Sequence, residues 1–177
     1  MNEPRKTIFK CSLLALCLNA SVSSGEVKMF DRPLAAEEMG NILFSNKSSQ
    51  AGVKTRTIVI SDNRADSIGF PIKFQFNSVG ILDESRSFLD EVGKMMTLEK
   101  FSQEKIVVEG HTDAYGSQKY NHLLSRRRAI AVKDYLLKNY QIPENRLFVA
   151  AKGESKPLSG KSPFASVNRR VQFYRAP

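Results

Sequence analysis

The stretch of residues 110–128 constrains the fold of this chain most, because signals for a strand, a turn and a helix follow one another there. Asp113 stands just after a short apolar run, and Gly116 marks the turn that follows. A helical pattern then begins and carries Arg128 beside its apolar stripe. This order brings one carboxylate and one guanidinium to the same mouth of a sheet. Such a pair suits a ligand that has both an ammonium and a carboxylate group.

Arg128 is the sharper of these two signals. Leu124 and Val132 stand one helical turn on either side of it, so spacing places Arg128 on or beside the buried stripe. Burying a guanidinium without a partner costs roughly several kcal/mol, so a partner is expected. The two preceding arginines are expected to be solvated. Asp113 alone fits a turn-forming aspartate equally well, and the arginine on the next helix favours a role in ligand binding.

Hydrophobic periodicity predicts four strands and two long helices after residue 66. The first strand, residues 71–76, alternates with Ile72, Phe74 and Phe76 on one face. Further strands are expected at residues 105–110, 146–150 and 170–174, and helices at about 83–96 and 117–140. The inner stripe of the second helix is expected to hold Tyr120, Leu124, Val132, Tyr135 and Leu136. The order β-α-β-α-β-β predicts an α+β sandwich, with two helices packed on one face of a mixed four-stranded sheet.

Residues 1–25 have the three-part layout of a secretory signal peptide, with cleavage expected between residues 20 and 25. A ragged cytoplasmic N-terminus is the alternative. Both cysteines, Cys11 and Cys17, lie in this segment, so the mature chain would have no thiol and no disulfide. Lipidation of Cys17 is less favoured than simple cleavage, because Leu16 precedes it where bacterial lipoprotein signals usually carry a small residue.

Residues 26–66 resemble an extension rather than a domain, with a short amphipathic helix expected at 35–44 and a strand at 56–61. The sequence has no run of about 18 apolar residues, so no membrane-spanning helix is expected. The net charge of +9 favours anionic surroundings such as nucleic acid, anionic lipid or an acidic cell-wall polymer. Nucleic acid is disfavoured, because the basic residues are scattered and no aromatic stacking stripe accompanies them.

No arrangement of residues in the sequence predicts a catalytic or metal site. His111 and Asp113 could supply two ligands to a metal, but no third ligand stands at a supporting spacing. Neither a Ser-His-Asp order nor a pair of general-acid carboxylates is recognisable, and no phosphate-binding glycine loop is present. We therefore expect a protein that is not an enzyme and has no cofactor.

Residues 68–175 resemble the OmpA-like, or OmpA C-terminal, peptidoglycan-binding domain. The leader and the extension are similar to those of small secreted members of this family that lack a barrel. The segment expected to form the domain is residues 67–177. The resemblance rests on five motifs in the family's order: Phe74-x-Phe76; Gly110-His111-Thr112-Asp113 with Gly116-Ser117; Tyr120-Asn121-x-x-Leu124-Ser125-x-x-Arg128-Ala129; Gly153-Glu154-Ser155-x-Pro157; and Asn168-Arg169-Arg170-Val171.

The resemblance implies non-catalytic binding of the peptide stem of peptidoglycan in the periplasm of a Gram-negative cell, anchoring an envelope component to the wall. It implies that Asp113 meets the ammonium of diaminopimelate and that Arg128 meets its carboxylate. Many members carry aspartate where this chain has Asn77, which removes a charge. The expected ligand-binding residues are Asp113, Arg128, Thr112, Asn121, Leu124, Asn77, Gly116 and Arg169.

Two other functions stay open from the sequence. The chain could be a structural partner in an envelope complex, such as a flagellar-motor or secretion assembly, with residues 26–66 making the decisive contact. An enzyme acting on the wall is a weaker alternative, since no acid-base pair is visible. The expected location is the periplasm, and association with the outer membrane is left open.

Overall fold

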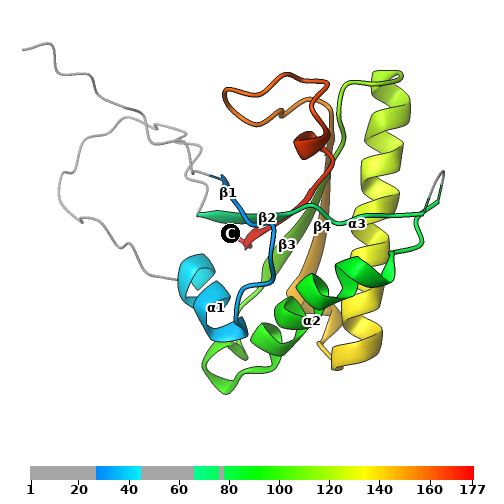
Figure 1. The fold of residues 1–177 in the computed structure, drawn as a ribbon. Helices are drawn as coiled ribbons and strands as arrows, with labels where there is room; N and C mark the ends of the chain where they lie inside the picture. Colours follow the sequence, from blue (N-terminus) through cyan, green and yellow to red (C-terminus); the bar gives the residue numbers. More distant parts are fainter. Residues whose placement is uncertain (1–26, 45–65, 76–77) are drawn as a thin grey trace, which may run out of the picture.

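A mixed sheet and three helices make up the part of the chain that the computed structural model describes, residues 27–44, 66–75 and 78–177 (Figure 1). The strand order is β1-β2-β5-β3-β4. The elements are β1 (Val27–Met29), α1 (Ala36–Phe44), β2 (Ser67–Phe70), α2 (Asp83–Thr97), β3 (Ile106–His111), α3 (Gln118–Tyr140), β4 (Leu147–Gly153) and β5 (Val171–Arg175), with short 3-10 turns at Glu99–Phe101, Glu144–Arg146 and Ser166–Asn168.

Strand directions determine which loops meet at the site. β1 pairs with β2 in parallel and β3 pairs with β4 in parallel, whereas β5 lies antiparallel between β2 and β3. β1, β2, β3 and β4 therefore all run in one direction and β5 runs against them. As a result, the loops that follow β3 and β4 lie at the same end of the sheet as the loop that leads into β5.

The core lies between one face of the sheet and the three helices. Alternate residues of the central strands point into this core. Phe173 of β5 pairs with Ile68 of β2 on one side and with Val108 of β3 on the other, and all three side chains are fully buried. Phe70 packs against Phe88 of α2, with ring centroids 5.2 Å apart. α1 contacts α2, and α2 contacts α3, so the helices cover this face in succession (Figure 1). Burial of apolar surface stabilises a fold by about 25 cal/mol per Å², so this layer is the main source of stability.

The predicted α+β class and mixed sheet are confirmed, but the sheet has five strands and is covered by three helices. The additional strand and helix come from residues 27–44. The helix expected at 35–44 is present as α1, and it is not peripheral. Its apolar side chains and one residue before it join the common core: Leu34, Met39, Leu43 and Phe44.

The strand predicted at residues 71–76 is wrong, because the strand at this point, β2, ends at Phe70. Pro71 follows it, and a proline has no N–H to continue the ladder of hydrogen bonds. Ile72 still packs in the core, and Phe74 makes only an isolated bridge to Ile81. Phe76 lies outside the described residues.

The other predicted elements of the domain are confirmed within a few residues. β3, β4 and β5 occupy the predicted strands, and α2 and α3 the predicted helices. The predictions for the leader, for Cys11 and Cys17, and for the strand at 56–61 concern residues outside the described ranges. In the described parts of the chain, no helix combines the length and the apolar character needed to cross a bilayer.

The first half of α3 presents small side chains to the sheet, which corrects the predicted inner stripe. Tyr120 is 50% exposed and Leu124 is only partly buried, whereas Val132 and Leu136 are buried as expected. The buried face comprises Asn121, Ser125, Ala129, Val132 and Leu136. Large apolar residues do not fit there because the helix approaches β3 closely. A Cβ added to Gly110 would lie 2.2 Å from the carbonyl oxygen of Ser125.

Replacing Gly110 with alanine is therefore expected to destabilise the fold by about 1–3 kcal/mol, because the added methyl group must push helix backbone away from the sheet. Thermal unfolding of the purified variant measures this loss. Gly160→Ala gives the contrast, since nothing lies within 4 Å of a Cβ there and only its positive φ of 71° opposes the change. Equal melting temperatures for Gly110→Ala and wild type would show that the close helix–sheet approach is not tight.

Candidate functional site

Asp113 lies in the turn after β3 and is 7% exposed. Its Oδ2 atom forms an ion pair with Nη1 of Arg169 at 2.6 Å, and Oδ1 accepts a long hydrogen bond from the backbone N–H of Tyr115 at 3.4 Å. Arg169 stands just before β5, so the antiparallel placement of β5 beside β3 brings these distant residues together. The carboxylate has four lone-pair sites, and these contacts leave capacity for a further donor.

Arg128 lies on α3, and its guanidinium contacts an aromatic ring. Its guanidinium carbon lies 4.8 Å from the centre of the Phe74 ring. Its Nε atom is buried and has no hydrogen-bond partner in the described structure. Burial lowers the pKa of Arg128 below its ordinary value, and the charge of Arg169 also lowers it, while the charge of Asp113 acts against this. The guanidinium remains charged and has spare donors.

A buried asparagine fixes the turn that carries Asp113. Asn121 is 1% exposed, and its side-chain nitrogen donates to the backbone oxygens of Asp113 and Tyr115, at 3.3 and 3.0 Å. It also donates to the carboxylate of Glu154. Gly116 has a φ of 99°, which favours glycine in this turn. Ser117 caps α3 as predicted, accepting from the N–H of Tyr120 at 3.3 Å.

The remaining predicted ligand-binding residues occupy different positions. Thr112 is buried beside Asp113, and its hydroxyl has no hydrogen-bond partner among the described residues. Leu124 is partly buried one turn before Arg128. Asn77 lies outside the described residues. The structure thus gathers Asp113, Arg169 and Thr112 around one turn, and Arg128 on α3 is near enough for its charge to interact with those of Asp113 and Arg169.

Arg170 and its neighbours belong to the opposite face of the sheet, away from the core that α1, α2 and α3 cover. Arg170 is buried and donates to the backbone oxygen of Lys156 at 3.0 Å, which ties down the long loop before β5. With its amide oxygen turned to Arg170, Gln172 accepts from Nε and Nη2 at 2.7 and 2.8 Å. Burial lowers the pKa of Arg170 to about 10, and the charge of Glu109 opposes this shift. Arg170 therefore stabilises the fold instead of lining the site.

Glu109 and His111 stand two residues apart on β3 and share this face. Glu109 is 1% exposed; its Oε1 lies 2.9 Å from Nε2 of His111, and its Oε2 accepts from the Tyr174 hydroxyl at 3.1 Å. Burial lowers the pKa of His111. Burial also raises the pKa of Glu109, but the hydrogen bonds from His111 and Tyr174 and the charge of Lys152 outweigh this and lower it. The result is a neutral histidine beside an ionised carboxylate.

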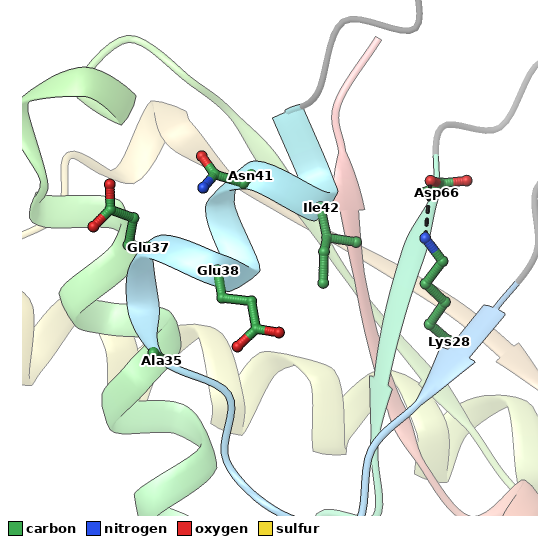
Figure 2. Close-up of a pocket in the computed structure, with 7 residues that line it drawn as sticks. All are labelled: Lys28, Ala35, Glu37, Glu38, Asn41, Ile42 and Asp66. Carbon is green, nitrogen blue, oxygen red and sulfur yellow. Dashed lines mark hydrogen bonds and ion pairs between the residues drawn. The ribbon is translucent and has the colours of Figure 1, made fainter.

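A hollow of 580 Å³ is present at the other end of the sheet. It is lined by Lys28, Ala35, Glu37, Glu38, Asn41, Ile42 and Asp66, with an ion pair of 3.3 Å between Lys28 and Asp66 (Figure 2). Asp66 precedes β2 and Asp113 follows β3, and these strands run in the same direction. The hollow is therefore separate from the Asp113 site, and its three carboxylates make it a poor place for an acidic ligand.

Sequence reasoning missed three features of this region. It gave Phe74 no role toward Arg128, it did not pair Glu109 with His111, and it did not single out Tyr115. A charged residue in an apolar strand, followed two residues later by histidine on the same face, is a signal that was available. In the described part of the chain, no three histidine, cysteine or acidic side chains come together as a metal site.

Comparison with known sequences gives several relatives. The chain is 32% identical over 103 residues to outer membrane porin F of Pseudomonas aeruginosa and 34% identical over 91 residues to outer membrane protein A of Escherichia fergusonii. These matches cover 57% and 51% of this chain but only 29% and 37% of the relatives. The chain therefore spans well under half the length of either.

Solved structures with this fold include the OmpA-like domain of FopA1 from Francisella tularensis, with a TM-score of 0.53 and 20% identity over 63% of this chain and 72% of that one. An outer membrane protein from Borrelia burgdorferi has a TM-score of 0.50 and 31% identity, covering 63% of this chain and 89% of the other. The peptidoglycan-associated lipoprotein from Burkholderia pseudomallei has a TM-score of 0.50 and 24% identity, covering 59% and 88%. The sequence model described as the OmpA family matches residues 73–170, more than half of the chain. This chain, with its five-stranded sheet and its Asp113 turn, belongs to the OmpA family.

Proposed function

We propose that this chain is a non-catalytic module that binds the peptide stem of peptidoglycan in the periplasm and anchors an envelope component to the wall. The observation that carries the proposal is Arg128, a partly buried guanidinium with no ion pair among the described residues, whose charge interacts with that of the buried Asp113 carboxylate. A ligand that carries both an ammonium and a carboxylate can pair its ammonium with Asp113 and its carboxylate with Arg128. The side chain of diaminopimelate ends in such a pair.

Family membership supports the location and the class of ligand. One relative with the same fold is named a peptidoglycan-associated lipoprotein, and others are named as outer membrane proteins. The net charge of +9 suits an acidic wall polymer. Association of this chain with the outer membrane is part of the same proposal.

Asp113 binds the ligand ammonium while it keeps its ion pair with Arg169. Arg169 donates from one side at 2.6 Å, and the ammonium approaches the remaining lone pairs. Arg128 donates to the ligand carboxylate, and its two terminal nitrogens suit a bidentate contact. Each charge-assisted hydrogen bond contributes about 1.5–3 kcal/mol before the cost of association, which suggests micromolar affinity.

The other predicted residues complete the binding surface in different ways. The backbone around Thr112 and Leu124 supplies further polar contacts. Gly116 and Asn121 position the turn. The side-chain nitrogen of Asn121 donates to the backbone oxygen of Tyr115 and to the carboxylate of Glu154. A contact from Asn77 remains part of the proposal.

Co-sedimentation with purified sacculi tests this function. Wild type is expected to pellet with diaminopimelate-type sacculi, and Asp113→Asn is expected to bind about 10- to 100-fold more weakly, because it loses the charge that attracts the ammonium. Lysine-type sacculi lack the second carboxylate at this position, so binding to them should also be weak.

Asp134→Asn is the matched control, since Asp134 is an exposed acid on the nearby helix α3 and its loss changes the net charge equally. Thermal melts establish that each variant is folded. Equal sedimentation of wild type, Asp113→Asn and Asp134→Asn would leave only nonspecific basic adhesion and refute the proposal.

A structural role in an envelope assembly remains the second candidate, and the hollow beside α1 favours it as a place of contact (Figure 2). Deleting residues 26–66 does not separate the two functions, because Met39 and Leu43 belong to the common core. Sacculus binding itself is the better discriminator, since an assembly partner needs no affinity for diaminopimelate.

A further inference from the structure

Two aromatic side chains stand exposed beside the proposed site. Tyr115 is 66% exposed and Phe164 is 52% exposed. Their ring centroids lie 5.1 Å apart in an edge-to-face arrangement of 61°. Aromatic rings bring a large gain when they are buried, so a pair that remains in water next to a binding site indicates a contact surface.

The backbone on both sides of this pair is held in place by buried amides. Asn121 donates to the backbone oxygen of Tyr115 at 3.0 Å. Asn168, fully buried, donates to the backbone oxygens of Ser162 and Pro163 at 2.9 and 3.0 Å, just before Phe164. The two segments are joined where the N–H of Ala114 donates to Pro163 at 3.1 Å. The rings are thus presented by fixed segments and would lose little backbone freedom on binding.

The pair is continuous with the Asp113 site, because Tyr115 stands two residues further along the same turn and its backbone N–H donates to the Asp113 carboxylate at 3.4 Å. An extended chain spans about 3.3–3.6 Å per residue, so Tyr115 lies within roughly 7 Å of Asp113 along the backbone. In peptidoglycan, the diaminopimelate is joined through a short peptide of similar reach to a sugar. A stem whose diaminopimelate is held at Asp113 therefore has its sugar within range of the aromatic pair.

We propose that Tyr115 and Phe164 form a sugar-contacting surface that takes the saccharide end of the ligand whose peptide binds at Asp113 and Arg128. This inference rests on the proposed function. A sugar ring has faces of C–H groups that pack on the negative face of an aromatic ring, and hydroxyl groups at its edge. The Tyr115 hydroxyl can donate to or accept from those groups. The surface makes the chain select glycan-linked stems over free peptide.

Calorimetric titration of the full chain with two soluble ligands tests this selection. One ligand is a disaccharide-tripeptide containing diaminopimelate, and the other is the same tripeptide without sugar. Wild type is expected to bind the disaccharide-tripeptide about five-fold more tightly. The double variant Tyr115→Ala with Phe164→Ala should lose this preference and keep the wild-type affinity for the free tripeptide.

Phe148→Ala is the matched control, because Phe148 is also an exposed aromatic residue, 45% exposed, near the start of β4 and away from the site. It should leave both affinities unchanged. Equal affinity of wild type for the two ligands would overturn this inference but not the proposed function. The aromatic pair would then be a candidate contact for a protein partner. An equal loss on both ligands in the double variant would also overturn it, since the pair would then only shape the turn. Failure of wild type to bind either ligand would refute the proposed function and this inference together.

Discussion

Replacing Arg128 with methionine is expected to abolish sacculus binding while the folded protein keeps or gains stability. The guanidinium is half-buried, its Nε has no partner among the described residues, and burial lowers its pKa. Exchanging a desolvated charge for an unbranched apolar side chain is often neutral or stabilising. Methionine also keeps a favourable contact with the ring of Phe74. Losing the proposed bidentate contact to the ligand carboxylate should weaken binding about 100-fold.

The two measurements are a titration with the disaccharide-tripeptide and a thermal melt of the free protein. Arg127→Met is the matched control, because Arg127 is exposed on the neighbouring position of α3 and carries the same charge. It should bind like wild type. A variant at Arg128 that binds normally, or one that loses several degrees of melting temperature, would show that this guanidinium serves the fold and not the ligand.

Replacing Glu109 with glutamine is expected to have the largest effect on stability. Glu109 is 1% exposed and bonds to His111 and Tyr174, and its charge acts on the buried Arg170. Removing that charge leaves the guanidinium of Arg170 buried without its neighbouring anion, at a cost of roughly 3 kcal/mol. For a domain of this size the melting temperature should fall by about 10 °C.

The pH dependence distinguishes a charge effect from a packing effect. The folded pKa of Glu109 lies below its ordinary value of 4.5, so its contribution is fully present above pH 4.5 and is lost as the pH falls through the folded value. The difference in melting temperature between wild type and Glu109→Gln should therefore be large at pH 7 and shrink below pH 4.5. Glu144→Gln removes an exposed carboxylate paired with Lys133 and should cost less than about 1 kcal/mol. A difference that stays constant down to pH 3 would contradict the charge argument.

Local signals predicted the long elements of this fold well. α3 begins after Ser117, whose side chain caps it, and ends at Tyr140 before Gln141, as periodicity and capping rules indicate. α2 and β3 were also predicted within a residue or two. The phase of the first half of α3 was not predicted, because its close approach to Gly110 selects small polar side chains that hydrophobicity alone does not recognise.

Long-range pairings were beyond what single-sequence patterns provide. The strand β1 has three residues and no clear alternation, so only its pairing with β2 defines it. The ion pair between Asp113 and Arg169 joins residues 56 positions apart. It exists because β5 inserts between β2 and β3, an order that periodicity does not give. Spacing and the resemblance to a family both singled out Asp113 and Arg128, whereas the contact of Arg128 with Phe74 needed coordinates.

The common direction of β1, β2, β3 and β4 has a mechanical consequence for an anchor. Val27 begins β1 and Arg175 ends the antiparallel β5, so both lie at the end of the sheet opposite the turn that carries Asp113. A load applied at either of these residues and resisted by a ligand at Asp113 runs along the strands, perpendicular to the hydrogen bonds between them. The ladder bonds then share the force in shear instead of opening one after another. The same sheet that positions the turn therefore suits a domain that holds its ligand under tension.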